Sequence, residues 1–301
     1  MSVPETYTYE KIYLSLWELA QRYHSFTEFR VIGESHDERK IPMLEIGEGN
    51  EVVFCLAGVY GTEQIAPVLL LKMSEEYCQA YEYDWAAENF YHIRHLLKKI
   101  RLCMIPMLNP DGYEICRKGY RSIRNPIYRQ MLKMKRIPRE EFFSNARALD
   151  IGRNFPTFYC NRQRIDQEPA SENETKAFMR ILQEYTSRGL LSFNEKEEGI
   201  VYCRQAQKLF YNQKSDRIAR QLQKCFNNSG SIYAHITKNP LRYSDGIGSP
   251  EQFYAEKINK PSLEIEIPYR NLFSDHEENE LRYGYEQIRL LPLEYLYSLD
   301  E

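Results

Sequence analysis

The apolar run Val52–Leu56 is followed by the turn-like heptapeptide Ala57–Glu63, and the stretch 64–81 after it has the character of a helix. Five consecutive apolar residues of this kind favour a buried strand. Tyr60 and Glu63 stand three residues apart. In the first turn of a helix they would share one face and could point at one ion. The sequence therefore predicts a strand, a functional turn and a helix, with a phenol at a place that suits an imidazole ligand.

Strand-like and helix-like segments alternate along the rest of the chain. Strands are expected at 29–32, 41–46, 102–107, 190–193, 200–203, 231–236 and 262–267, and helices at 8–24, 64–81, from 171, at 208–225 and from 274. Thr8 is expected to cap the first helix, and Ser171 and Ser274 begin capping boxes. Asn109 to Gly112 are expected to form a turn. This order indicates an α/β fold, a sheet covered by helices on both faces. No linker or repeat divides residues 1–301, so we expect a single domain.

Composition excludes some classes of partner. Forty Lys and Arg against 43 Asp and Glu leave a net charge of −3, which favours neither nucleic acid nor an anionic membrane, although basic residues gather between Arg117 and Arg139. Seven cysteines, with no C-x-x-C pair, stand partly in apolar runs, as reduced core residues do. The N-terminus has no secretion signal and no segment is long enough to span a membrane. We therefore expect a cytoplasmic protein.

Three further motifs carry a resemblance to a known family. They are Ile105-Pro-Met-Leu-Asn-Pro-Asp-Gly112, Asp150-Ile-Gly-Arg-Asn-Phe-Pro156 and Ser171-Glu-Asn-Glu-Thr175. Together with the turn at Gly58, and in this order, they resemble the zinc metallocarboxypeptidases of the carboxypeptidase A type. The resemblance covers nearly the whole chain and is strongest to the bacterial γ-D-glutamyl-diamino acid peptidase-like branch, which cleaves peptidoglycan stem peptides. It implies a mixed, mainly parallel sheet of about eight strands between helices, with the active site at the carboxyl ends of strands.

The resemblance also implies a zinc site made of two His and one Glu. Those positions fall on Tyr60, Glu63 and Asn194 in this chain. Only Glu63 is a good zinc ligand, because a phenol is protonated at neutral pH and an amide oxygen is a neutral, hard donor. His92 and His95 are spaced like a ligand pair, but they match no position of the family site and are expected to be surface residues. Zinc is therefore expected to be absent or weakly bound.

The catalytic groups of the family are partly kept. The carboxylate that activates water and moves its proton falls on Glu266, in the strand-like segment 262–267. Strand alternation puts Glu264 on the same face, so the register decides between the two. The Arg that polarises the scissile carbonyl in the family matches Arg124.

The groups that hold the substrate carboxylate in the family are also partly kept. Arg153 matches the arginine of an Asn-Arg pair, but Gly152 replaces the asparagine. A planar guanidinium suits bidentate capture of a carboxylate. Tyr243 matches the mobile tyrosine that binds substrate, since the sequence 246–251 resembles the segment that follows it.

Structural interpretations of these residues stand beside the functional ones. Tyr60 could be a packing aromatic, Asn194 a residue that bonds backbone at a strand end, and Glu63 a carboxylate favoured by the helix dipole. Arg153 could pair with Asp150 instead of a ligand. Glu266 is harder to explain structurally, because a carboxylate buried in an apolar strand needs a partner.

Three functions are consistent with these patterns. The favoured one is a catalytically impaired peptidase-like protein that binds the carboxylate of a peptide or cell-wall peptide. Metal-assisted hydrolysis needs a cation to polarise the carbonyl and to lower the pKa of water, and the predicted ligand set is poor. The alternatives are an active metallopeptidase with a non-standard metal site, and a scaffold that uses the fold for interactions.

Overall fold

The computed structural model describes residues 7–88, 90–158, 168–196, 199–202, 207–228, 248–268 and 277–300. Its main sheet has seven strands in the order β1-β2-β6-β3-β7-β9-β8, and β4 and β5 form a separate two-stranded ladder. The strands are β1 (Thr27–Glu34), β2 (Lys40–Ile46), β3 (Glu51–Ala57), β4 (Ala86–Ala87), β5 (Tyr91–His92), β6 (Ile100–Ile105), β7 (Ser187–Lys196), β8 (Gly199–Val201) and β9 (Ser262–Pro268).

The centre of the main sheet is parallel and its margins are antiparallel. β3 runs parallel to β6 and to β7, and β7 runs parallel to β9. β2 pairs antiparallel with β1 and β6, and β8 pairs antiparallel with β9. The expectation of a mixed, mainly parallel sheet with helices on both faces is confirmed; the described part of the chain gives its main sheet seven strands, where about eight were expected.

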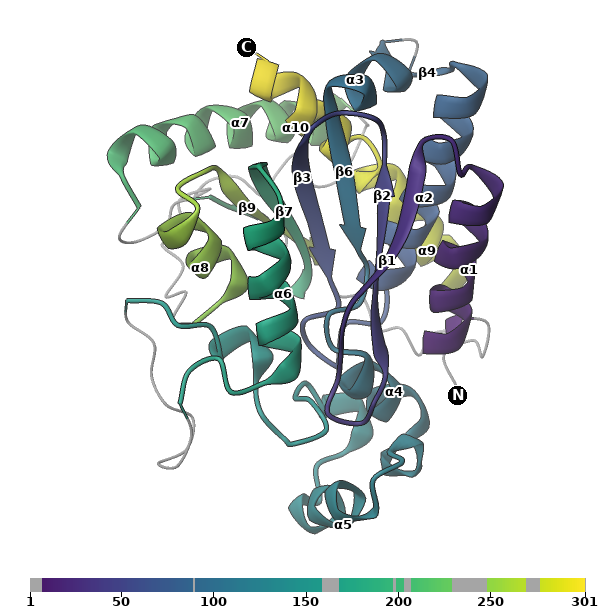
Figure 1. Ribbon diagram of the computed structural model, residues 1–301, viewed down its shortest axis with the longest axis vertical. Coiled ribbons are helices and arrows are strands. Elements are labelled where there is room, and N and C mark those ends of the chain that lie inside the picture. Colours follow the sequence, from purple (N-terminus) through teal and green to yellow (C-terminus); the bar gives the residue numbers. More distant parts are fainter. Residues whose placement is uncertain are drawn as a thin grey trace.

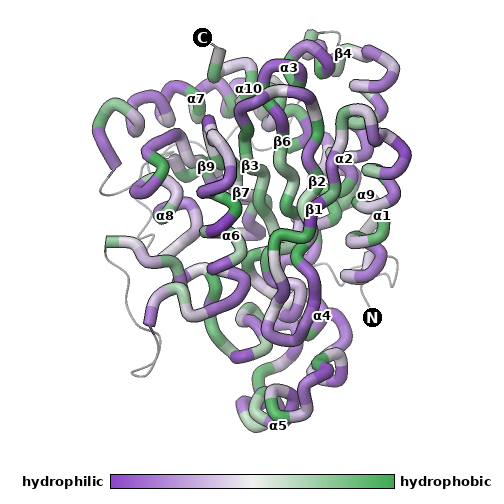
Figure 2. Tube along the Cα trace, viewed as in Figure 1, coloured by the Kyte–Doolittle hydropathy of each residue, from purple (hydrophilic) through white to green (hydrophobic). Residues whose placement is uncertain are grey.

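Helices cover both faces of this sheet (Figure 1). They are α1 (Tyr9–Arg22), α2 (Ala66–Tyr83), α3 (Ile93–Lys99), α4 (Pro110–Lys118), α5 (Pro126–Lys135), α6 (Asn173–Glu184), α7 (Leu209–Asn228), α8 (Pro250–Lys257), α9 (Glu277–Ile288) and α10 (Leu291–Asp300). One apolar core joins the sheet to α1, α2, α3, α7, α9 and α10, and a second joins its other face to α6 and α8. Figure 2 shows the apolar strands between these more polar helices. No helix in the described part of the chain is long and apolar enough to cross a membrane.

The apolar runs of the sequence form strands because both faces of the central sheet are covered. Every residue from Val52 to Ala57 is fully buried in β3. Side chains alternate between the two cores, so that Val53 and Cys55 face one and Phe54 and Leu56 the other. The five cysteines in the described residues are free, and four of them are buried.

Two expectations about turns and helix caps are wrong. Asn109 does not begin a simple turn: its side chain accepts from the Gly112 amide at 2.9 Å and caps α4, with Pro110 in the first turn. Ser171 does not cap α6, whose N-cap is Glu172 without a side-chain capping bond. Thr8 does cap α1, by accepting from Lys11 N. The strand expected at 231–236 and the cap expected at Ser274 lie outside the described residues.

The carboxyl ends of the central strands meet at one edge of the sheet. The arrows of β3 and β6 point toward the end of the molecule that carries α4 and α5 (Figure 1). At this edge Glu195 of β7 accepts from the backbone amides of Ile65 and Ala66, at 2.6 and 2.7 Å. Ile65 is the N-cap of α2 and makes no side-chain capping bond of its own. Glu195 therefore supplies the cap of α2 from a neighbouring strand and fixes the turn that precedes the helix.

Glu195→Gln tests this cap through the pH dependence of stability. Burial raises the pKa of Glu195 to about 7, although the backbone amides at residues 64–66 act against the shift. Because the folded state then holds the proton more tightly, this group's contribution to stability is present below about pH 4.5 and is lost as the pH rises through 7. Between pH 4.5 and 7 we expect the free energy of unfolding to fall less in the variant than in the wild type. Urea denaturation at several pH values measures this difference.

Glu195→Ala serves as the control for the hydrogen bonds themselves. It removes the carboxylate oxygen that accepts both hydrogen bonds, and we expect it to lower the free energy of unfolding by about 1–3 kcal/mol at any pH in this range. Equal pH slopes in the wild type and Glu195→Gln would show that Glu195 does not titrate there.

Candidate functional site

The turn after β3 is locked to the turn after β6 by backbone contacts. Leu108 N donates to Ala57 O at 3.1 Å, and Asn109 N donates to Gly58 O at 2.7 Å. Gly58 has φ +63°, and a Cβ added there would lie 2.9 Å from the Met107 Cα. Only glycine meets both demands without strain. The two turns therefore form one rigid support at the carboxyl edge of the sheet.

The sequence predicted Tyr60 and Glu63 in the first turn of a helix. They lie instead in the turn before α2, because α2 begins only at Ala66. A backbone hydrogen bond of 3.0 Å from Glu63 N to Tyr60 O still closes a tight turn between these two residues. The Glu63 carboxylate is 1% exposed and accepts from the amides of Val59 and Tyr60, at 2.9 and 3.2 Å. It thus stabilises the turn in which it stands.

The Tyr60 ring packs against the backbone of Gly152. A Cβ added to Gly152 would lie 2.2 Å from the Tyr60 hydroxyl oxygen. Any larger residue at 152, including the asparagine of the family motif, would collide with the phenol as it stands. The two departures from the family pattern are therefore one structural change, in which a ring takes the space that glycine leaves open.

Carboxylates surround the Tyr60 hydroxyl group. Burial raises its pKa well above the ordinary value, and the negative charges of Asp150, Glu251, Glu264 and Glu63 raise it further. The three glutamates are at most 5% exposed. The phenol therefore stays protonated at neutral pH, and a protonated phenol is a poor metal ligand.

β7 and β9 bring the remaining candidate residues to the same edge. Asn194 of β7 lies opposite Glu266 of β9, and Ser192 opposite Glu264. Asn194 Nδ2 donates to Glu264 Oε1 at 2.7 Å. Its Oδ1 is buried and accepts no hydrogen bond from the described residues. Glu264 and Glu266 are 5% and 7% exposed, on the face of β9 opposite its apolar residues, as alternation predicts.

The two arginines occupy different surroundings. Arg153 follows Gly152 directly, its side chain is 72% exposed, and its Nε lies 3.7 Å from an Asp150 carboxylate oxygen. Arg124 is exposed in the loop before α5. Its backbone N donates to the Asp37 carboxylate. Its guanidinium lies 3.5 Å from the backbone carbonyl of Glu38, the residue after Asp37.

The structure thus gathers Tyr60, Glu63, Asn194 and Glu264 into one group, with Glu266 beside Asn194 in the sheet. Arg153 borders the group through Gly152 and Asp150, whose charge also reaches Tyr60. Tyr243 lies outside the described residues. The roles given to Glu266, Arg124 and Arg153 stay predictions.

These residues do not fit a zinc ion. Zinc in proteins is held by imidazole nitrogen, thiolate or carboxylate ligands, and two of the three donors here are a protonated phenol and an amide. Within the described residues, three donors of the type His, Cys, Asp or Glu converge at a different place, on His36, Glu172 and Glu174.

Sequence reasoning missed that second cluster. His36 was given no role, and Glu172 and Glu174 were assigned to a capping box. No local spacing joins a turn residue to a helix so distant in the sequence. His92 and His95 are both exposed, as expected, although His92 lies in β5 and not in a helix.

Comparison with known proteins agrees with this fold. Residues 12–270 match the Peptidase_M14 family model, zinc carboxypeptidase. The chain therefore belongs to the zinc carboxypeptidase family. It is 26% identical to mouse carboxypeptidase M over 182 residues, which is 57% of this chain and 34% of that protein. It is 27% identical to bovine carboxypeptidase O over 219 residues, 67% of this chain and 51% of that protein. The matches thus span about a third to a half of these relatives' length.

Solved structures share the fold at lower identity. Bovine thrombin-activatable fibrinolysis inhibitor, in complex with tick carboxypeptidase inhibitor, matches with a TM-score of 0.71 and 17% identity, over 98% of this chain and 97% of that one. A metallo-carboxypeptidase from Burkholderia cenocepacia matches with a TM-score of 0.66 and 12% identity, over 98% and 69%. At these identities the likeness is one of fold alone.

A double-mutant cycle tests the contact between Tyr60 and Gly152. Gly152→Ala alone should lower the free energy of unfolding by about 1–3 kcal/mol, because the new methyl group overlaps the phenol. In a Tyr60→His background the shorter ring leaves room, so the cost should fall by about 1 kcal/mol or more. Urea denaturation of the four proteins measures the coupling, and strictly additive effects would contradict the contact.

Proposed function

We propose that this chain is a carboxypeptidase-like protein that binds the carboxylate of a peptide and has lost, or nearly lost, zinc-dependent hydrolysis. One observation carries the proposal. The residue in the place of the first family histidine, Tyr60, is a protonated phenol packed on Gly152 among buried carboxylates. The asparagine of the family motif could not stand at position 152 beside this phenol, so the site is adapted to the phenol and not merely missing a ligand.

The remaining groups support binding better than catalysis. Glu266, with Glu264 beside it on the same face, could accept a proton from water. General-base help of this kind contributes about 10²–10⁴-fold. Without a cation, none of the described residues of the site lowers the pKa of the attacking water or strongly polarises the carbonyl of the substrate. Arg124 would offer only one exposed charge.

The ligand that we propose is a peptide with a free carboxylate. Arg153 presents an exposed guanidinium, oriented by Asp150, at the border of the site, and a guanidinium binds carboxylates in two parallel hydrogen bonds. The buried carboxylates below it favour a ligand that also carries an amino group. A peptidoglycan stem peptide has both groups, and we place its recognition, with Tyr243 as a further contact, in the cytoplasm.

A second candidate function rests on the buried Asn194 Oδ1, which accepts no hydrogen bond from the described residues. Together with Glu63 it offers two oxygen donors, which suit a hard cation such as Mg²⁺ or Mn²⁺ better than zinc. An active metallopeptidase with such an ion is the alternative. Turnover of acyl-amino-acid substrates that depends on added Mn²⁺, and that is lost in Asn194→Ala, would favour it.

Arg153→Ala tests the binding role. We expect the variant to bind a peptide with a free C-terminal carboxylate about 10-fold or more weakly, since a charge-assisted bidentate contact is worth about 1.5–3 kcal/mol. Binding of the amidated peptide should not change. Isothermal titration calorimetry measures both.

Arg220→Ala is the matched control. Arg220 in α7 is also exposed, at 60%, and also pairs with an aspartate, Asp216, at 3.0 Å. If both variants bind the free-acid peptide as the wild type does, Arg153 does not recognise the carboxylate.

Restoring the ligands tests the metal argument. The triple variant Tyr60→His, Asn194→His, Gly152→Asn should gain one equivalent of zinc that survives dialysis, because it recovers both imidazoles. Elemental analysis measures the zinc, and hydrolysis of acyl-amino-acid substrates measures the activity. Both are made in a His36→Ala background, so that the cluster of His36, Glu172 and Glu174 cannot contribute zinc. Tight zinc with turnover in the protein that keeps Tyr60 and Asn194 would overturn the proposal.

A further inference from the structure

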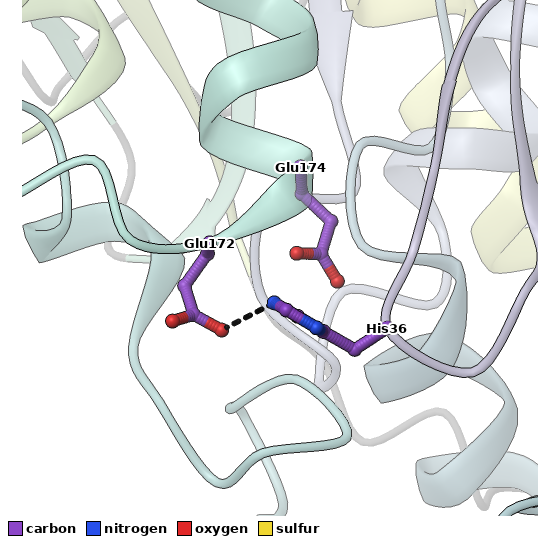
Figure 3. A group of neighbouring side chains, drawn as sticks. All are labelled: His36, Glu172 and Glu174. Atoms are coloured by element: carbon purple, nitrogen blue, oxygen red, sulfur yellow. Dashed lines mark ion pairs between the residues drawn. The ribbon is translucent and has the colours of Figure 1, made fainter.

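His36, Glu172 and Glu174, none of which belongs to the site described above, converge on one point (Figure 3). His36 lies in the turn between β1 and β2, Glu172 is the N-cap of α6, and Glu174 is in its first turn. His36 Nε2 is 3.1 Å from Glu172 Oε2, and one ligand atom from each of the three residues lies within 4.8 Å of the other two.

The spacing suits ligands of a single ion. Metal–ligand bonds of about 2.0–2.1 Å at angles of about 90–110° put neighbouring ligand atoms about 3.0–3.4 Å apart. The pair from His36 and Glu172 already has this separation, and the Glu174 carboxylate points toward the same ring (Figure 3). The Glu174 ligand atom lies within 4.8 Å of the other two, so the set closes on one ion with a small shift of this side chain.

One buried oxygen in the cluster has no hydrogen-bond partner in the described part of the chain. Glu174 is 0% exposed, and its Oε1 accepts no hydrogen bond from the described residues. Leaving a buried carboxylate oxygen without a donor costs free energy, so the position calls for a proton or a cation. His36 Nε2 lies 3.1 Å from Glu172 Oε2, and the Asn173 amide approaches the same nitrogen at 3.4 Å.

Neighbouring side chains hold the carboxylates in place. Asn145 Nδ2 donates to Glu172 Oε2 at 2.7 Å and lies 3.4 Å from Glu174 Oε2. Arg147 and Ser171 donate to Glu172 Oε1, at 3.2 and 2.8 Å. Outer contacts of this kind orient the ligands of metal sites. The His36 side chain is 14% exposed, which leaves a path for an ion and for water ligands.

We propose that His36, Glu172 and Glu174 bind a divalent transition-metal ion, with Zn²⁺ as the representative. One imidazole and two carboxylates select first-row transition ions over Mg²⁺ and Ca²⁺, which prefer oxygen ligands alone. The ion is structural. It ties the β1–β2 turn to α6, and α6 in turn is tied to the Arg153 segment, because Glu172 N donates to Asn154 Oδ1 at 3.1 Å.

Titration of Zn²⁺ into chelator-treated, full-length protein tests the proposal. Calorimetry should show one ion bound per chain at this cluster, and the Tm should rise with added Zn²⁺. His36→Ala and Glu174→Gln should each weaken binding at least about 10-fold and remove the rise in Tm. Glu174→Gln preserves the shape of the side chain, so it keeps the test valid if His36→Ala folds poorly.

Two controls separate this site from others. His95→Ala removes an exposed histidine outside the cluster and should bind Zn²⁺ as the wild type does. Asn194→Ala, in the carboxypeptidase-like site, should also leave this binding intact. The proposal is overturned if no Zn²⁺ binds, or if it binds equally well to His36→Ala and Glu174→Gln. Neither outcome bears on carboxylate binding by Arg153, which has its own experiment.

Discussion

The candidate site depends on the backbone contact between the turns that follow β3 and β6. Two hydrogen bonds, from Leu108 N to Ala57 O and from Asn109 N to Gly58 O, join these turns, and the space at Gly58 admits no side chain. Because the parallel strands end at the same edge, the turn after β3 and the ends of β7 and β9 face one another across a short distance. The arrangement of the candidate site follows from that juxtaposition.

The surroundings of Tyr60, as well as the ligand set, differ from what a zinc ion prefers. A phenol can bind a metal once a cation lowers its pKa, but burial and four nearby carboxylates raise the pKa of Tyr60 instead. The same carboxylates would favour a cationic group of a ligand. Gly152 completes the change, since it makes the room in which the ring lies. The site therefore combines negative charge within and a positive guanidinium, Arg153, at its border.

The ion proposed at the His36 cluster would have a different role from the metal of the family site. The cluster lies at the amino end of α6, and through Asn154 it is connected to the residue next to Arg153. An ion there would stabilise the segment that presents the guanidinium without touching a bound peptide. A protein of this family could in this way use a metal for structure while its inherited metal position serves for binding.

The sequence by itself determined the fold class and the strands of the main sheet in the described part of the chain, because continuous apolar runs and the alternation in β9 are local properties of the chain. It also indicated that Tyr60 and Asn194 are poor zinc ligands, which follows from their chemistry alone. Only the tertiary structure showed that Tyr60 packs on Gly152, that Asn109 caps a helix, and that His36 meets Glu172 and Glu174. The first and last of these are contacts between segments far apart in the sequence. Their energies depend on how helices and strands pack, which no local pattern encodes.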